Sequence, residues 1–455
     1  MPVSSYFYIH ISKMTTRKNP FIKQDMLSEY FTVFNKVLDT DIAKKINLRK
    51  FTERWIYLGT KNGIKTASSV TKFYKNISGR PRQQLEPVQS TDVFDLNYNE
   101  EQIMISETLR AFSDQMRHHA EKVDESGVIP ASLHEEYNAM QLAFMQIPEP
   151  LGGLMKDRAT VTQMLMAETL AYGDLGQAAA FFATHSFINA IVKWGSAAQQ
   201  QDLLPKFLSD TPIKATMALQ ENQPLFNPFS LHTKAVKNGS EYIISGTKTM
   251  VPIAKDADYF LISAQISSHK YIIAILDKDN NGITIFEDKY MGLKPAGLCS
   301  VTFDNVVIDE SAILGIEDEF SYEEFISYGK LGWCAMAVGC CQAVLDYVIT
   351  YANDRNAFGE PISNRQAVAF MIADMKIEVD SMRMLTQRAA ARAEQGLDFG
   401  REAYLAHVLC SDKAMQIGSN GVQLLGGHGY IKDFPVERWY RDLRAVALAP
   451  NGMHL

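Results

Sequence analysis

The spacing of apolar residues changes twice along this 455-residue chain, and this change constrains the fold more than any single motif. From about residue 94 to 210, apolar residues recur at helical spacing. Between Ile213 and Asp309 the apolar runs are short, alternating or β-branched, as in EYIISG and YIIAILD. Helical spacing returns from Ser321 onward with long apolar faces. The chain therefore predicts a β domain inserted between two helical domains.

Local signals set the expected boundaries of these parts. Asn99, with Glu100 to Gln102 following it, is placed to cap a helix. Asn238-Gly239 and Asn281-Gly282 are both typical of hairpin turns. We expect an α+β protein made of a basic helical extension and linker (1–90), an N-terminal α domain (91–212), a central β-barrel or sandwich domain (213–310) and a C-terminal four-helix bundle (311–455).

Composition and cysteine usage indicate a soluble, reduced protein. A chain of this length with 46% hydrophobic residues can bury two or more cores. The five cysteines show neither the spacing of a disulfide framework nor that of a zinc site, so we expect free thiols and no metal. We read no signal peptide at the start. The longest apolar run, LGWCAMAVGCCQAVL, is too short for the ~20 residues of a membrane span. A cytoplasmic location is expected.

Charge is divided unevenly between the extension and the rest. Residues 1–90 hold 16 Lys and Arg against 6 Asp and Glu, a net +10, whereas residues 91–455 hold 29 against 46, a net −17. A basic arm could contact a membrane surface, nucleic acid or the acidic body. Its aromatic residues, such as Trp55 and Phe73, need burial, and no Arg-rich recognition motif is present. We therefore favour helices that dock on the body, leave peripheral membrane contact open and expect no nucleic acid partner.

Three motifs follow one another in the helical parts. They are PEPLGG (148–153), RNAFG (355–359) followed by Gln366, and QLLGGHGY (423–430) followed by PVER and RD. With these motifs and the α, β, α order, the sequence resembles the acyl-CoA dehydrogenase family over roughly residues 94–450. The resemblance implies a FAD-dependent oxidoreductase that introduces a double bond between the α and β carbons of a fatty acyl-CoA thioester.

The same resemblance implies how FAD is held. A dinucleotide needs a guanidinium for its phosphates and an apolar surface beside its adenine. By resemblance, one subunit supplies Arg355, Phe358 and Gln366, and a neighbouring subunit supplies Gln423, Gly426 and Gly427. A homodimer or homotetramer is therefore implied, with an electron-transfer flavoprotein-type acceptor. Taken singly, Arg355 would be read as a surface ion pair and the two glycines as a helix C-cap and turn.

The positions against the flavin ring depart from the family. Where the family has a glycine-rich Thr-Glu-Pro-Gly-x-Gly-Ser-Asp loop, this chain has Leu219 followed by QENQPLFNP, without glycine. Where the family has Trp-Ile-Thr, this chain has Met250, Val251 and Pro252. A methionine can still cover a flavin as an apolar lid, but Pro252 can donate no hydrogen bond. Leu219, Met250 and Pro252 are our candidates for the flavin face.

Neither usual position of the family's catalytic glutamate carries a carboxylate. Counting from Asp442 places the first position at Pro450, and counting back from Arg355 places the second at Gly329. Lys330 stands where the family commonly has an arginine, so it is our candidate for contact with the substrate. Glu324 could act as the base, although an exposed acid in the first turn of a helix is the simpler interpretation.

Three hypotheses follow from the sequence. The first is an acyl-CoA dehydrogenase whose base comes from an unusual place, such as Glu324. The second is a flavoprotein of the same fold with other chemistry, an oxidase or monooxygenase, or one that needs a partner subunit. The third is a non-enzymatic assembly subunit, which would not need to keep Arg355, Phe358 and Gln366. We favour the first.

Overall fold

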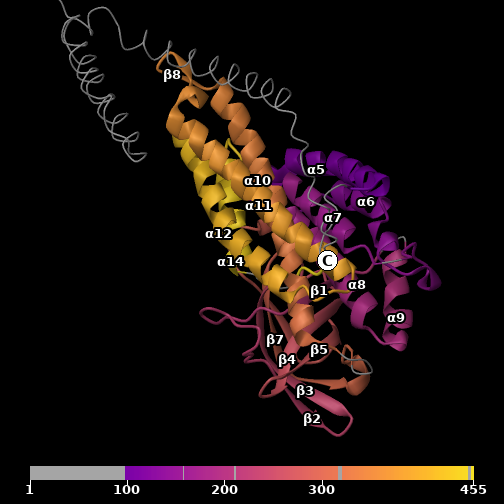
Figure 1. Ribbon diagram of the computed structural model, residues 1–455. Coiled ribbons are helices and arrows are strands. Elements are labelled where there is room, and N and C mark those ends of the chain that lie inside the picture. Colours follow the sequence, from indigo (N-terminus) through magenta and orange to yellow (C-terminus); the bar gives the residue numbers. More distant parts are fainter. Residues whose placement is uncertain (1–97, 157, 210–211, 316–319, 449–451) are drawn as a thin grey trace, which may run out of the picture. The chain divides into compact units, whose positions relative to one another are not determined.

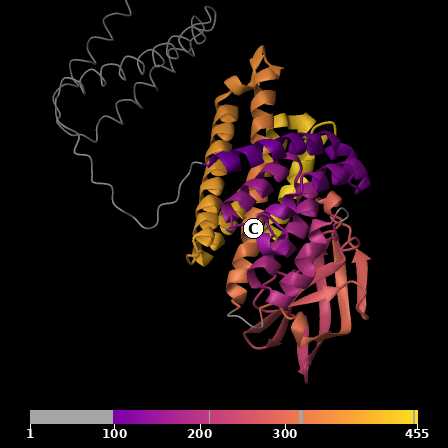
Figure 2. The same ribbon diagram turned by 90° about the vertical axis from the view of Figure 1, so that its right-hand side faces the viewer.

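The computed structural model describes residues 98–156, 158–209, 212–315, 320–448 and 452–455 (Figure 1). The expected helical extension lies outside these residues and stays a prediction. The described part confirms the expected fold class, with helices, a central curled sheet and helices again. In both views the strands gather at one end of the body (Figures 1 and 2).

The N-terminal domain is helical, as its apolar spacing predicts. Asn99 caps the first helix in a reciprocal capping box, since its side chain accepts from the N–H of Gln102 and the Gln102 side chain accepts from the N–H of Asn99. The expected cap is thus confirmed. The helices are α5 (Glu100–Ser126), α6 (Ala131–Ala139), α7 (Thr160–Gly173), α8 (Leu175–Trp194) and α9 (Ala197–Leu203). Helices α7 and α8 are buried on nearly all sides, as their mostly apolar sequences require.

The central domain is a seven-stranded sheet. Its strands are β1 (Ala215–Ala218), β2 (Lys234–Asn238), β3 (Glu241–Val251), β4 (Tyr259–Ser267), β5 (Lys270–Asp277), β6 (Ile283–Glu287) and β7 (Cys299–Asp309). The strand order is β1-β4-β2-β3-β7-β6, with β5 paired to β4. The sheet buries its own cluster of apolar side chains, including Phe260, Ile262, Val301 and Phe303.

One of the two expected hairpins is confirmed and the other is wrong. Asn238 and Gly239 close the antiparallel turn between β2 and β3, where Asn238 is paired with Glu241. Asn281 and Gly282 do not join paired strands, because β5 pairs with β4 and β6 pairs with β7. Gly282 instead bonds to a neighbouring strand, since the N–H of Asp304 donates to its carbonyl at 2.9 Å. A turn dipeptide cannot show which strands it joins.

The C-terminal domain is built around one long buried helix. Helix α10 (Tyr322–Asp354) packs against α7, α11 (Gln366–Glu394) and α12 (Gly400–Leu425). Between α10 and α11 lies a small hairpin of β8 (Asn356–Ala357) and β9 (Glu360–Pro361), and α13 (Val436–Leu443) and α14 (Ala445–Leu448) follow α12. One apolar core joins the two helical domains.

Two described helices, α8 and α10, have the length and hydropathy of membrane spans. Most of each apolar window is buried within the fold, 89% for α8 and 78% for α10. We therefore interpret α8 and α10 as core helices of the two helical domains.

The five cysteines are free and buried.

The two turn glycines give a test of this fold. Both have positive φ, but a Cβ at Gly282 would lie 2.4 Å from the Asp304 carbonyl oxygen, whereas a Cβ at Gly239 would meet nothing within 4 Å. Gly239→Ala should cost about 1 kcal/mol of unfolding free energy for its backbone conformation alone. Gly282→Ala should cost clearly more in urea unfolding, and equal losses would contradict this packing.

Candidate active site

Arg355, Phe358 and Gln366 lie at one end of the C-terminal bundle. Arg355 caps α10, and Phe358 sits at the tip of the β8–β9 hairpin, labelled β8 in Figure 1. Phe358 is 95% exposed, and the Arg365 guanidinium lies 5.2 Å from its ring centroid. Gln366 begins α11 and is exposed. A guanidinium, an aromatic ring and an amide are thus presented on an open surface.

The second group of FAD candidates lies at the end of α12. Gln423 is exposed in its last turn, and Gly426, with φ +60, follows its last residue. A Cβ at Gly426 or Gly427 would meet nothing within 4 Å. The Tyr351 hydroxyl, in the last turn of α10, lies 2.7 Å from His428 Nδ1, just after these glycines. Both groups therefore occur at the same end of one chain's bundle, although the resemblance had been taken to divide them between two subunits.

This end of the bundle fits the adenine and phosphate part of FAD. The Arg355 and Phe358 side chains are exposed, so neither is buried by contacts within the chain. The backbone at Gly426 and Gly427 is open to close approach, because nothing in the described part of the chain covers it. A phosphate can therefore reach the guanidinium, and an adenine can reach the ring and the glycine backbone.

The flavin-face candidates come together at the edge of the sheet. Leu219 is buried directly after β1, Met250 is half-buried near the end of β3 with φ +54, and Pro252 is buried beyond it. The two segments are joined because the N–H of Thr249 donates to the carbonyl of Gln220 at 2.9 Å. The structure thus brings Leu219, Met250 and Pro252 into one apolar region.

A buried ion pair fixes this region from inside. Lys248 Nζ lies 2.8 Å from Glu221 Oε1, and their side chains are 0% and 2% exposed. Lys248 also donates to the Leu219 carbonyl at 3.3 Å and to Ser263 Oγ at 3.0 Å. Burial lowers the pKa of Lys248 to about 8, although Glu221 acts in the opposite direction. The loop without glycines is therefore held by charge and hydrogen bonds.

The final described segment, residues 452–455, lies buried against α8 and α10. The N–H of Gly332 donates to the Met453 carbonyl at 3.1 Å, and the N–H of Met453 points to the Gly329 carbonyl at 3.4 Å. A Cβ at Gly332 would lie 2.0 Å from that Met453 oxygen, so this close approach requires glycine. A Cβ at Gly452 would lie 3.9 Å from Leu219 Cδ1. The segment thus connects the flavin-face region to position 329.

Sequence reasoning missed the residues that hold this segment. Asn189 Nδ2 donates to the His454 carbonyl at 3.0 Å, and Arg158 donates to the Leu455 main-chain oxygen at 2.7 Å. The Arg158 guanidinium also lies 4.4 Å from the Tyr328 ring centroid. The His454 side chain is fully buried, and burial lowers its pKa to about 3. No local sequence pattern predicts these contacts, because the two hydrogen bonds join residues 297 and 265 positions apart.

The base and substrate candidates lie in the first turns of α10. Pro450 lies outside the described residues, and Gly329 carries no side chain. Glu324 Oε1 lies 3.0 Å from Lys193 Nζ on α8, with 37% of its side chain exposed. Lys330 is half-buried, and burial lowers the pKa of its ammonium group. Glu324 as base stays a prediction.

Lys330 is directed toward α12. Its Nζ lies 5.8 Å from the Tyr404 ring centroid. It also lowers the pKa of His407, after the larger effect of burial. No described carboxylate forms an ion pair with Lys330, so its charge is free to meet an anionic or polar substrate group. Its substrate role stays a prediction.

Helix α10 separates the two halves of the candidate site. Gly329 and Arg355 are 26 positions apart on one continuous helix, which corresponds to about 39 Å. The flavin-face region lies near the first residue and the adenine-binding candidates near the second. That two chains share each FAD stays a prediction.

Comparison with known proteins decides the family. Three family descriptions match in order: acyl-CoA dehydrogenase, N-terminal domain (99–211), middle domain (216–306) and C-terminal domain (321–450). The chain belongs to the acyl-CoA dehydrogenase family. The resemblance inferred from the three motifs is therefore confirmed.

Individual relatives agree with this assignment. The mitochondrial short-chain specific acyl-CoA dehydrogenase of Bos taurus is 30% identical over 356 residues, covering 76% of this chain and 85% of the relative. An acyl-CoA dehydrogenase of Bacillus subtilis (strain 168) is 27% identical over 367 residues, covering 78% and 95%. The solved butyryl-CoA dehydrogenase from Megasphaera elsdenii superposes with a TM-score of 0.72 at 25% identity, covering 79% and 96%.

Membership of the acyl-CoA dehydrogenase family makes this chain a flavoprotein oxidoreductase acting on CH–CH groups, with FAD as its cofactor. A solved FAD complex of PigA, at 22% identity and a TM-score of 0.70, shares the fold. Among the residues that the structure describes, no group of three His, Cys, Asp or Glu side chains could hold a metal ion.

The Lys248–Glu221 pair predicts a strong effect on stability. Lys248→Met leaves a buried carboxylate without its cation and should lower the unfolding free energy by about 3–5 kcal/mol. Adding Glu221→Gln should recover part of this loss, because it removes the buried negative charge, while its one oxygen replaces only one of the two carboxylate oxygens that accept from the N–H groups of His232 and Thr233. Urea unfolding of both variants is the measurement. A double variant less stable than Lys248→Met alone would contradict the pairing.

Proposed function

We propose that this protein introduces a double bond between the α and β carbons of a fatty acyl-CoA thioester. The observation that carries the proposal is the exposed group of Arg355, Phe358, Gly426 and Gly427 in a member of the acyl-CoA dehydrogenase family. These side chains and backbone groups have little role inside their own chain. They are suited to a dinucleotide, which a non-enzymatic assembly subunit would not need.

The reaction removes two hydrogens from adjacent carbons. The C–H bond at the α carbon breaks and its proton goes to a base, while the β carbon loses a hydride and the C=C bond forms. Bound FAD supplies the acceptor for that hydride. The chain must therefore provide an apolar face for the flavin, a proton acceptor and contacts that fix the thioester.

Named residues can meet these requirements. Leu219, Met250 and Pro252 form the apolar face and exclude water beside the reacting carbons. Lys330 offers a half-buried charge for the substrate. Glu324 is our candidate for the base, and it would have to leave its 3.0 Å contact with Lys193 to reach a thioester near position 329.

Two copies of the chain would complete each FAD site. The separation of about 39 Å between Gly329 and Arg355 along α10 supports this proposal. Phe370, Ile377, Tyr404 and Val408, on α11 and α12, are exposed in the single chain. This apolar surface supports a homodimer or homotetramer, in which each copy gives Arg355 to one site and Met250 to another.

A soluble flavoprotein carrier is the proposed electron acceptor. One solved structure that resembles this chain, with a TM-score of 0.71 and 25% identity, is described as the electron transferring flavoprotein of Acidaminococcus fermentans. Such a carrier fits the family, and a cytoplasmic location stays a prediction, since the relatives include mitochondrial enzymes. Contact of residues 1–90 with a membrane also stays a prediction, outside the described residues.

A second candidate function is a flavoprotein oxidase of the same fold. The observation that favours it is Gly329, which lacks a carboxylate and has the Met453 main chain against it. An oxidase that removes no α-proton from a thioester would not need that base. The prolyl acyl carrier protein oxidase AnaB shares the fold, with a TM-score of 0.69 at 22% identity.

An anaerobic titration with acyl-CoA thioesters tests the choice between these candidates. Saturated acyl-CoAs of increasing chain length should bleach the visible flavin band if the protein is a dehydrogenase. Glu324→Gln should abolish the bleaching if Glu324 is the base, whereas Glu323→Gln, one position away in the same first turn, should leave it unchanged. A yellow protein that no acyl-CoA bleaches would favour the oxidase.

Complementation tests the shared site. Arg355→Ala and Met250→Arg should each lose FAD when expressed alone, because they damage opposite ends of the cofactor site. Co-expression produces mixed dimers in which one site carries both substitutions and the other carries neither. These mixed dimers should regain FAD in about half of their sites. Failure to regain FAD, with both variants folded, would mean that one chain holds each FAD.

A further inference from the structure

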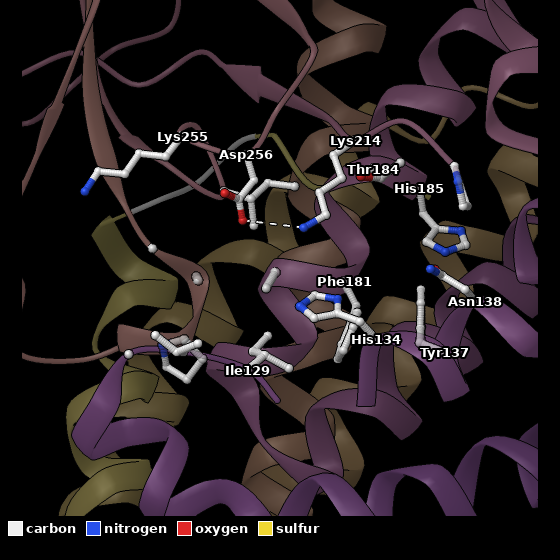
Figure 3. Close-up of a pocket in the computed structure, with 18 of the residues that line it drawn as sticks. Ile129, His134, Tyr137, Asn138, Phe181, Thr184, His185, Lys214, Lys255 and Asp256 are labelled. Atoms are coloured by element: carbon white, nitrogen blue, oxygen red, sulfur yellow. Dashed lines mark hydrogen bonds and ion pairs between the residues drawn. The ribbon is translucent and has the colours of Figure 1, made fainter. Parts of the chain in front are cut away.

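A large pocket begins directly beyond the flavin-face candidates, where Ile253, next to Pro252, is part of its lining. It encloses about 1270 Å³ between α6, α8 and the segments before β1 and β7 (Figure 3). Figure 3 shows Lys214 and Asp256 joined on the side of the sheet, and His134, Tyr137 and Phe181 on the helical side. None of the residues assigned above to FAD or to the thioester lines it. The family's reaction therefore leaves this pocket unexplained.

One wall of the pocket fixes the tautomer of a histidine. His185 is 4% exposed, and its Nδ1 lies 2.6 Å from Gln146 Oε1. Gln146 in turn donates from Nε2 to Gln163 Oε1 at 2.5 Å, so its carbonyl oxygen is the atom turned to His185. That oxygen only accepts, so the proton of the neutral ring sits on Nδ1. Nε2 is therefore an acceptor, and no described residue bonds to it.

A second polar group on this wall also lacks a partner. The Tyr137 hydroxyl is buried and has no hydrogen-bond partner among the described residues. Its ring centroid lies 5.6 Å from that of His185, with the two rings nearly perpendicular. The Tyr137 oxygen is not exposed to the pocket, which leaves His185 Nε2 as the unpaired acceptor to which a ligand can donate.

The pocket carries little net charge. Lys214 lies 3.4 Å from Asp256, and Lys255 lies 2.5 Å from Glu287, so these cations are already paired. Burial lowers the pKa of His185 to about 4, and it also lowers the pKa of His134. Both imidazoles are thus uncharged at pH 7. Apolar side chains supply much of the remaining wall, among them Ile129, Leu142, Phe181 and Ile188.

We propose that this pocket binds an uncharged, largely apolar molecule through a hydroxyl group, which donates to His185 Nε2. A hydroxyl matches the site because it can donate to the unprotonated nitrogen of the neutral ring. An ether oxygen and an ionised carboxylate cannot donate to this nitrogen. None of the residues assigned to FAD lines the pocket, so the proposal does not depend on which reaction the flavin performs.

Calorimetric titration of the FAD-loaded protein with 4-methylphenol and 4-methylanisole tests the proposal. The two probes have similar shape, but methylation of the oxygen in 4-methylanisole removes the donor. At pH 7 the phenol should bind at least about five-fold more tightly, as expected for one hydrogen bond in a buried site. Equal affinities, or no detectable binding of the phenol, would overturn the proposal and leave a site for water only.

Substitutions assign the preference to His185. His185→Gln and Gln146→Leu should both reduce the ratio of the two affinities toward one, the first by removing the ring and the second by freeing its tautomer. His134→Gln, in the same pocket, should keep the ratio. If His185→Gln fails to fold, Gln146→Leu provides the same test. A ratio that survives either of the first two substitutions would contradict the role of His185.

Discussion

The burial of α10 is the constraint on which the rest of the structure depends. Its apolar length packs against α7, α11 and α12, so its two ends are fixed at opposite sides of the body. One end holds Gly329 and Lys330, and the other holds Arg355. This separation along the helix is one basis of our proposal that two copies share each FAD. The other basis is the resemblance of the motifs to those of the family.

Much of the fold could be predicted from the sequence because its signals are local. Helical and alternating periods show the order of domains, and the pair Asn99 and Gln102 marks a helix start that the structure confirms. Strand pairing is not local. The dipeptide Asn281-Gly282 has turn chemistry, but the partners of β5 and β6 are decided by packing across the sheet. That is why one of two expected hairpins was wrong.

Some parts of the candidate site could likewise be predicted from local sequence, and other parts could not. The motif around Arg355 and Phe358 could be read directly, and the structure places these residues on an open surface that fits FAD. The relay from Gln163 through Gln146 to His185 could not be read, because nothing in the spacing of these residues shows that they meet. Position 329 could be predicted in part. The sequence shows that it is a glycine, but only the structure shows that the main chain of Met453 lies against it.

Native mass spectrometry of the purified, FAD-loaded protein tests the central claim most directly. Sites shared reciprocally within a two-fold dimer give an even number of chains, with one FAD for each chain and no FAD on a free monomer. The account predicts dimers or tetramers with this stoichiometry. A monomer that retains FAD would contradict it, because one chain would then reach both ends of the cofactor despite the length of α10.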